Sequence, residues 1–436
     1  MDILKDNVNR TYFRFLLPTI GATLITSVYI LADAIIIGRF INDKAMAALN
    51  VLTPIFSLFY GSGYLLGVGG AVLMAAAFGE NKTKRGQKYF TSALFLSALL
   101  SLIYVILFNL GFEFLIKAIG ATADITSYIR SYGRILVSGA PLFLFSAMLQ
   151  VFVRNDLSPK TAMTGVIAGG ITNVVLDYIF IVPLNMGIAG GAWATLCGCV
   201  LSLIIYSAHF FKKENRLKPV KNSLNIKNIL MIFKCGFPNF FIEVSNAVVI
   251  SLFNIQLGRL IGFEGITAYG IVENAYLVVN SLSNGVAQAV QPLAAANYSS
   301  KNHKRVKLFF RNGLITAFLI SVLSTLLGEL YPQKVISLFV NANKSLLNIA
   351  VPAVRIYFIS FLVAVTNIYL SGFFQSLMKS RYSMIICVLR GLLLSSVFIF
   401  ILPLAFGTQA IWFVTPLAEF ATLIYGLYCL KFKIKL

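Results

Sequence analysis

The chain has 436 residues, of which 58% are hydrophobic and only 12% carry a charge. A water-soluble domain has roughly 25% charged residues, so this composition excludes a soluble protein. The 36 Lys and Arg and the 15 Asp and Glu give a net charge of +21, which in a soluble protein would raise the question of nucleic-acid binding.

Twelve apolar segments follow one another along the chain, and each is long enough to cross a bilayer core of about 30 Å as a helix. Helices are expected because an open strand in lipid would leave its backbone polar groups unpaired. The sequence therefore predicts an all-α integral membrane protein. The predicted spans are 13–38, 46–78, 89–111, 128–153, 161–182, 188–211, 231–257, 266–297, 308–328, 349–375, 383–405 and 408–430.

The basic residues are distributed unevenly between the two sides of these spans. With a cytoplasmic N-terminus, 26 of the 36 Lys and Arg fall in cytoplasmic segments and nine in outer segments, while Arg390 lies within a span. Cytoplasmic loops of membrane proteins carry such an excess. We therefore expect both termini in the cytoplasm and the chain in the cell (inner) membrane. The positive charge then indicates topology, and no nucleic-acid partner is expected.

The two halves of the chain repeat each other. Pro18 and Pro238 lie 220 residues apart, and Lys160 and Arg381 lie 221 apart. Each repeat has six predicted helices, an even number, so both should enter the membrane from the same side and be related by an axis along its normal. This predicts two pseudo-symmetric six-helix lobes around a central cleft. The expected domains are an N-terminal lobe at 1–211, a basic cytoplasmic linker at 212–230 and a C-terminal lobe at 231–436.

Five of the 15 carboxylates lie inside predicted spans. An ionised carboxylate at mid-bilayer costs at least about 2.5 kcal/mol, so each one is a functional-site hypothesis. The repeat partners of Asp33 and Asp177 are Phe253 and Phe398, which assigns these two acids to the chemistry of the N-terminal lobe alone. The five acids are Asp33, Asp177, Glu243, Glu273 and Glu419.

Two of these acids could form one site. Asn173 and Asp177 are four residues apart in one predicted helix and therefore share a face. If that face meets Asp33, two carboxylates and an amide oxygen form a hard-oxygen cluster. Such a cluster could hold Na⁺ or share a proton, because two close carboxylates cannot both ionise freely in a low dielectric. A hydrogen-bonded tie between helices is the structural alternative.

The segments PTIGATLITSVYILADAIIIGRF, SPKTAMTGVIAGGITNVVLDYIFIV and GIAGGAWATL resemble the multidrug and toxic compound extrusion (MATE) transporters, which are twelve-helix antiporters with two six-helix lobes. The resemblance covers the whole chain and is most specific at Pro18, Asp33, Asn173, Asp177 and Thr195. It implies that the two Asp, the Asn and the Thr bind the coupling H⁺ or Na⁺. It also implies that Pro18 is a bend point whose rearrangement accompanies protonation of the first Asp.

The second half matches the family less closely. Many members carry a Glu about eight residues after the proline of helix 7. Here Glu243 stands five residues after that proline, and Asn246 occupies the eighth position. The two lie three residues apart and so share a helix face. We therefore treat Glu243, Asn246, Glu273 and Glu419 as candidate contacts for a cationic substrate, with hydrogen-bonded structural acids as the alternative.

These observations predict a secondary active antiporter that exports organic cations or drug-like compounds from the cytoplasm in exchange for H⁺ or Na⁺ by alternating access. The 37 Phe, 19 Tyr and nine Met include side chains that suit flat lipophilic cations. A flippase for a lipid-linked or amphipathic substrate is the alternative. Such a flippase would be expected to carry several intramembrane bases for phosphate, and only Arg390 lies within a span.

An enzyme is not expected. Both histidines, His209 and His303, fall at cytoplasmic ends of predicted helices, and no metal-binding or nucleophile motif accompanies them. We expect no cofactor apart from the coupling ion. The expected partners are a small, lipophilic cationic substrate and membrane lipids, and the chain is expected to be a monomer.

Overall fold

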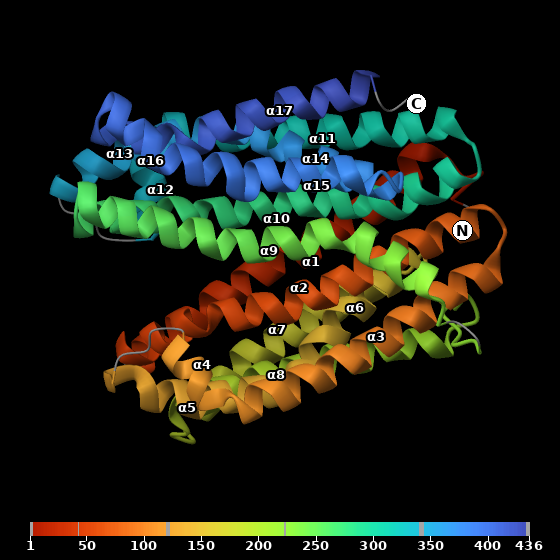
Figure 1. Ribbon diagram of the computed structural model, residues 1–436, viewed down its shortest axis with the longest axis horizontal. Coiled ribbons are helices and arrows are strands. Elements are labelled where there is room, and N and C mark those ends of the chain that lie inside the picture. Colours follow the sequence, from red (N-terminus) through yellow and green to blue (C-terminus); the bar gives the residue numbers. More distant parts are fainter. Residues whose placement is uncertain (1–2, 42, 119–122, 222–223, 340–343, 433–436) are drawn as a thin grey trace. The chain divides into compact units, whose positions relative to one another are not determined.

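All of the regular secondary structure is helical in the residues that the structure, a computed structural model, describes (Figure 1). These residues are 3–41, 43–118, 123–221, 224–339 and 344–432. The first half of the chain contains α1 (Val8–Phe40), α2 (Asp43–Gly79), α3 (Thr83–Leu110), α4 (Phe112–Ala118), α5 (Ala123–Ser138), α6 (Ala140–Asn155), α7 (Pro159–Ile181), α8 (Gly187–Ser207) and the short 3₁₀ helix η1 (Ala208–Phe211).

The second half repeats this order of long and short helices. It contains α9 (Ile226–Leu260), α10 (Phe263–Ser299), α11 (His303–Leu330), α12 (Pro332–Ser337), α13 (Lys344–Ile359), α14 (Phe361–Ser376), α15 (Ser380–Val388), the π-helical turn η2 (Leu389–Leu393), α16 (Leu394–Phe406), the 3₁₀ helix η3 (Thr408–Phe413) and α17 (Val414–Phe432).

Eleven of the twelve predicted spans correspond to helices that are long and apolar enough to cross a membrane, within the part of the chain that the structure describes. Two of these spans are bent pairs rather than single helices, α5–α6 with an angle of 52° and α13–α14 with an angle of 43°. The twelfth predicted span, 266–297, forms α10 but is not among the eleven. Its hydropathy is lowered by polar side chains, namely Glu273, Asn274, Asn280, Asn284, Gln288 and Gln291.

The internal repeat extends to the conformation of single loop residues. Asn81 and Lys301, which lie 220 residues apart, both have a left-handed backbone with φ of 60° and 61°. Leu157 and Met378, which lie 221 apart, have φ of 62° and 59°. A positive φ is uncommon for residues other than glycine. Its recurrence at the repeat spacing therefore indicates that the two halves fold in the same way.

The chain forms two compact units, and two helices contribute to both. The first unit is Leu17–Phe240, and the second combines Asp2–Leu16 with Phe241–Leu436. Helix α1 passes from one unit to the other next to Pro18, and α9 does so next to Pro238. Both prolines lie inside their helices, where the missing N–H removes a backbone hydrogen bond and favours a kink.

Glycines in α2 and α9 allow these two helices of the first unit to touch through their backbones. A Cβ atom on Gly69 would overlap the carbonyl oxygen of Ile232, and a Cβ atom on Gly236 would overlap the carbonyl oxygen of Leu65. Any larger residue would therefore force the helices apart. This contact holds the first half of α9 in the first unit.

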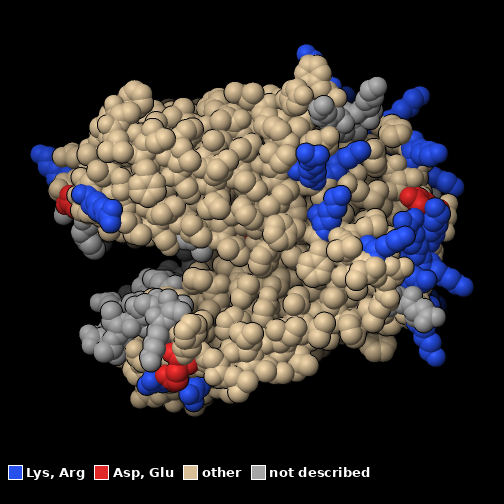
Figure 2. Space-filling view, viewed as in Figure 1, with Lys and Arg blue, Asp and Glu red and all other residues tan. Residues whose placement is uncertain are grey.

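The basic side chains are concentrated at one end of each unit. Figure 2 shows Lys and Arg gathered near the α2–α3 turn in the first unit and near the α10–α11 turn in the second. Both turns carry the basic residues that the sequence analysis assigned to the cytoplasmic side.

Candidate functional site

Helices α7 and α8 lie against each other through small residues. A Cβ atom on Gly198 would lie only 2.6 Å from the carbonyl oxygen of Gly169. One turn further on, Ser202 Oγ donates a hydrogen bond of 2.9 Å to the carbonyl oxygen of Gly165. This close approach fixes the register of the two helices and brings their polar side chains together near the centre of the pair.

A hydrogen-bonded pair of side chains links α7 to α8 beside this contact. Asn173 Nδ2 donates to Thr195 Oγ1 over 3.3 Å. Thr195 Oγ1 in turn donates to the carbonyl oxygen of Gly191 over 2.9 Å. Because the amide nitrogen of Asn173 serves as the donor, its Oδ1 atom is left to accept a hydrogen bond or to bind a cation.

The carboxyl groups of Asp33 and Asp177 meet next to this pair. Asp177 is fully buried one helical turn after Asn173, and its carboxyl group is close enough to that of Asp33 to form a hydrogen bond. Gly191 lies beside it, since a Cβ atom there would be in ordinary van der Waals contact with Asp177 Oδ1 at 3.6 Å. A carboxyl–carboxyl hydrogen bond requires a proton on one oxygen. Among the described residues, neither oxygen of Asp177 accepts a hydrogen bond from an ordinary donor group.

One residue that the sequence analysis missed belongs to the same region. The buried hydroxyl group of Tyr132 on α5 lies near Asp33, Asp177 and Thr195, although it forms no hydrogen bond within the described residues. Its ring packs against Phe56, with the ring centroids 6.1 Å apart. In the sequence Tyr132 cannot be told from the other tyrosines of the chain, because only the fold places its hydroxyl beside the acids.

The structure therefore brings together Asp33, Asn173, Asp177 and Thr195 but not Pro18. The proline is buried in α1, fifteen residues before Asp33, which corresponds to roughly 22 Å along the helix axis. Any influence of Pro18 on the acids must therefore pass along α1.

The donor atoms of this site suit a hard monovalent cation or a proton. Two carboxylates, an amide oxygen and hydroxyl groups are oxygen ligands, which alkali and alkaline-earth ions prefer to nitrogen and sulfur. In the described part of the chain, no group of three or more His, Cys, Asp or Glu is arranged to hold a metal ion. The residues therefore fit Na⁺ or H⁺ better than a transition metal.

The second unit carries a different polar cluster, built around an ion pair. Arg390 Nη2 lies 2.7 Å from Glu419 Oε1, and the two side chains are only 7% and 5% exposed. Arg390 also donates to the hydroxyl group of Tyr276 over 3.0 Å. Asn367 Nδ2 donates to Glu419 Oε2 over 2.7 Å. The π-helical turn η2 carries Arg390, and such turns are common at functional sites.

The remaining acids of the second unit have weaker partners. Tyr357 donates a hydrogen bond of 3.1 Å to Glu273 Oε1, and Tyr269 is a second hydroxyl partner of that carboxyl group. Glu243 and Asn246 are half-buried on α9. Within the described residues, no hydrogen bond or ion pair joins either of them to Glu273 or Glu419. The structure thus assembles Glu419 with Arg390 and leaves the other candidates separate.

Comparison with known proteins places this geometry in a family. The family model described as MatE matches residues 18–179 and again residues 238–401. The two matches begin at Pro18 and Pro238, which the internal repeat pairs. The model thus matches each half of the chain separately and covers well over half of its length.

Similar proteins are named as exporters. The chain is 23% identical over 411 residues to multidrug export protein MepA of Staphylococcus saprophyticus, and 25% identical over 415 residues to MepA of Staphylococcus aureus strain MRSA252. Both matches cover 94% of this chain and 90% of the relative. Among solved structures, an outward-facing multidrug resistance MATE family transporter matches with a TM-score of 0.91 at 21% identity, over 98% of this chain and 96% of the other. A MOP superfamily transporter from Pyrococcus furiosus matches with a TM-score of 0.90, also at 21% identity, over the same shares.

Proposed function

We propose that this chain, which belongs to the MatE family of multidrug export transporters, is a secondary active antiporter. It exports organic cations and drug-like compounds from the cytoplasm in exchange for H⁺ or Na⁺. Membership of the family confirms the predicted resemblance, the all-helical membrane fold and the prediction of a transporter rather than an enzyme. The cargo, the coupling ion and the exchange mechanism are our proposal.

The observation that supports ion coupling is the pairing of Asp33 with Asp177 inside the first unit. Two carboxyl groups in contact in a low dielectric are most stable when they share one positive charge, which can be a proton or Na⁺. Asn173 and Thr195 provide further oxygen ligands, and the Tyr132 hydroxyl group can donate to a carboxylate that has lost its proton. The site therefore has one charge state with the ion and another without it.

We propose that this change of charge is transmitted along α1. Neutralising Asp33 removes an ionic charge from the helix that bends at Pro18, so the two charge states favour different shapes of α1. Coupling then follows if the substrate prefers the conformation that the ion disfavours, because each ligand shifts the equilibrium by its difference in affinity for the two states. Ion entry from outside would thereby release the substrate there.

The acids of the second unit take separate roles in this proposal. Arg390 neutralises Glu419, which favours a structural role for that acid. Glu273, whose carboxyl group has tyrosine hydroxyl groups for partners, remains a candidate contact for a cationic substrate. Glu243 and Asn246 remain candidate substrate contacts on the shared face of α9. The same ion pair disfavours the flippase alternative, because Arg390, the basic residue that lies within a predicted span, is already bound to a carboxylate.

We further propose the organisation expected from the sequence, with lobes at 1–211 and 231–436 joined by a cytoplasmic linker at 212–230. Both termini lie in the cytoplasm, and the chain works as a monomer in the cell membrane. The gathering of Lys and Arg near the α2–α3 and α10–α11 turns supports this orientation (Figure 2).

Efflux of ethidium from proteoliposomes tests the proposal. A pH gradient and a Na⁺ gradient are imposed separately on the wild type, on Asp33→Asn, and on Glu113→Gln as a control at an exposed acid. We expect one gradient to drive efflux by the wild type and the control but not by Asp33→Asn. Gradient-driven efflux that Asp33→Asn retains in full would refute the assignment of the ion site. Failure of both gradients with folded wild-type protein would refute cation antiport.

A further inference from the structure

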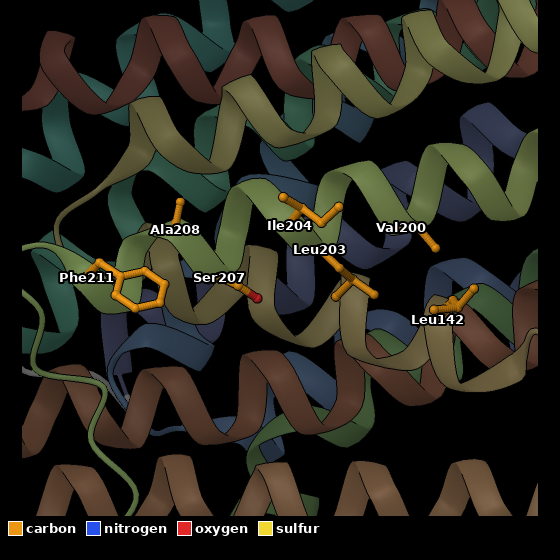
Figure 3. A pocket seen from close by; sticks show the side chains of 7 residues that line it. All are labelled: Leu142, Val200, Leu203, Ile204, Ser207, Ala208 and Phe211. Carbon is orange, nitrogen blue, oxygen red and sulfur yellow. The ribbon is translucent and has the colours of Figure 1, made fainter.

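An apolar groove runs along the outside of the first unit, between α6 and the end of α8. Leu142 of α6 forms one end, and side chains of α8 and η1 between Val200 and Phe211 form the rest (Figure 3). Its volume is about 440 Å³, and Ser207 provides the one polar side chain of its lining. The groove is therefore lined almost entirely by apolar side chains and has few hydrogen-bonding groups for a polar ligand.

The position of the groove on α8 shows that it faces away from the interior of the unit. Successive residues of a helix are about 100° apart. On that basis Ile204 lies nearly opposite the face that carries Thr195 and Ser202, which contact α7. Ile204 is 60% exposed and Phe211 is 91% exposed. Because Gly187–Phe211 is a candidate membrane span, the medium against this face is lipid hydrocarbon.

The length of the groove matches one leaflet of a membrane. The twelve residues from Val200 to Phe211 rise by roughly 16 Å, about half of a hydrocarbon core of about 30 Å. Its exposed aromatic residue, Phe211, stands at the cytoplasmic end of the span, where aromatic side chains commonly mark the interface. The groove therefore extends from the middle of the bilayer to its cytoplasmic surface.

Positive charge is held at that surface end of the groove. Lys212 and Lys213 follow Phe211 directly, and Lys218 and Lys221 come within the next eight residues. All four lysines are exposed, and Glu214 is the one acid between them. Lys212 Nζ donates to Thr161 Oγ1 over 2.6 Å, which ties the beginning of this segment to α7. The segment that directly follows the groove thus carries several exposed ammonium groups.

The fold holds this basic segment against the end of the unit. The Arg216 guanidinium donates to buried Asp156 Oδ1 over 2.9 Å and lies 4.2 Å from the ring centre of Phe78. Leu217 is only 1% exposed, and the backbone N–H of Val220 donates to a side chain of α3. Arg216 is therefore occupied by Asp156, while the lysines on either side of it are left to face the membrane surface.

From these observations we propose that the groove binds an anionic phospholipid of the cytoplasmic leaflet. One acyl chain lies along Val200, Ile204 and Phe211, and the phosphate is held by Lys212 and Lys213. Basic segments directly cytoplasmic of a spanning helix attract anionic lipids, with about 1 kcal/mol, or roughly fivefold in affinity, for each Lys near the surface. The excess of lysine over Glu214 selects an anionic headgroup over a zwitterionic one.

Native mass spectrometry of the detergent-purified protein tests this site with dioleoylphosphatidylglycerol and, for comparison, dioleoylphosphatidylcholine. The wild type should retain phosphatidylglycerol in preference to phosphatidylcholine. Lys212→Gln with Lys213→Gln should weaken that retention roughly 25-fold, which is the product of two fivefold losses. Lys304→Gln with Lys307→Gln removes the same charge from exposed positions at the start of α11. This control should change the retention of phosphatidylglycerol less than twofold.

A second variant and a soluble competitor test the groove itself. Ala208→Trp fills the groove while leaving the lysines in place and should also reduce retention of phosphatidylglycerol. Glycerol 3-phosphate, which has no acyl chain, should not compete. Equal retention of the two lipids, undiminished retention by the double lysine variant, or displacement by glycerol 3-phosphate would each overturn the proposal. Size-exclusion profiles matching the wild type establish that the variants are folded.

Discussion

The buried acidic side chains of this protein have two different kinds of partner. Glu419 has a cation, Arg390, fixed against it by the fold. Asp33 and Asp177 have each other, and their pair needs a positive charge from outside the chain. The first arrangement is complete as it stands, whereas in our proposal the second changes its charge when an ion binds or leaves. On that proposal, this difference separates a structural acid from a coupling acid.

Replacing Thr195 by valine should weaken the coupling site without removing its charge. The change removes the hydroxyl group that accepts from Asn173 and leaves that amide N–H without this partner. A lost hydrogen bond of this kind costs about 1 kcal/mol, so the ion concentration for half-maximal efflux should rise about fivefold. Ion titration of ethidium efflux measures this.

The control for this change is Thr164→Val. Thr164 lies on α7 with its hydroxyl group bonded to the backbone of its own helix, and it is exposed. Its replacement should leave the ion dependence as in the wild type. Equal behaviour of the two valine variants would contradict a role for Thr195 in ion binding.

The Arg390–Glu419 pair gives a prediction about stability. Removing one partner from a buried ion pair leaves an uncompensated charge and typically costs about 3–5 kcal/mol. Arg390→Met should therefore lower the thermal stability in detergent strongly, and addition of Glu419→Gln should restore part of it. Thermal unfolding of the single and double variants provides the comparison.

An exposed ion pair supplies the reference for this experiment. Arg130 and Glu113 are 2.8 Å apart, with side chains 50% and 54% exposed. Exposed pairs contribute about 0–1 kcal/mol, so Arg130→Met should have little effect. If Arg390→Met proved as harmless as Arg130→Met, the buried pair would not support the fold as described.

At the scale of helices, small residues decide how closely the elements approach. The α2–α9 contact depends on Gly69 and Gly236, where a Cβ atom would overlap backbone oxygens. The α7–α8 contact depends on Gly169 and Gly198 in the same way. These contacts bring α7 and α8 close enough for their polar side chains to bond. The proposed ion site therefore depends on glycines, which carry no functional group.

Gly236→Ala should destabilise the protein for this reason. Because the added methyl group meets the backbone of Leu65, the helices must move, and overpacking of this kind costs about 1–3 kcal/mol. Gly270→Ala is the matched control, since nothing lies within 4 Å of its added Cβ atom. That change in α10 should be neutral or stabilising by roughly 0.5–1 kcal/mol. Equal melting temperatures for the two variants would contradict the packing argument.

The sequence predicts the helices better than it predicts their shape. The length of each apolar segment is enough to locate the spans, because lipid permits few alternatives to a helix. The breaks at Gly139 and Ser360 escaped prediction, since hydropathy averages over a window and does not detect a bend within it. The polar helix α10 was predicted as an apolar span because its Asn and Gln side chains are interspersed with short runs of Val, Leu and Ala.

At the scale of the whole molecule, two copies of one fold have diverged in chemistry. The repeat partner of Asp33 is Phe253, whose ring stacks on Tyr269 with centroids 4.5 Å apart. Where one unit has an acid pair, the other has aromatic packing. The repeat spacing and the lone acids assign Asp33 and Asp177 to the chemistry of the first half alone, which stays a prediction. The contribution of Tyr132 and the pairing of Arg390 depend on distances across helices, which no local pattern contains.

Equilibrium binding of ethidium to the purified protein, measured across pH and Na⁺ concentration, tests the central claim most directly. If the Asp33–Asp177 pair takes the coupling ion and that ion opposes substrate binding, lowering the pH or raising Na⁺ should increase the Kd of the wild type. The double variant Asp33→Asn with Asp177→Asn keeps the shape of the site but lacks its charge. Its Kd should be independent of the ion. A double variant that retains the ion dependence of the wild type would contradict the account.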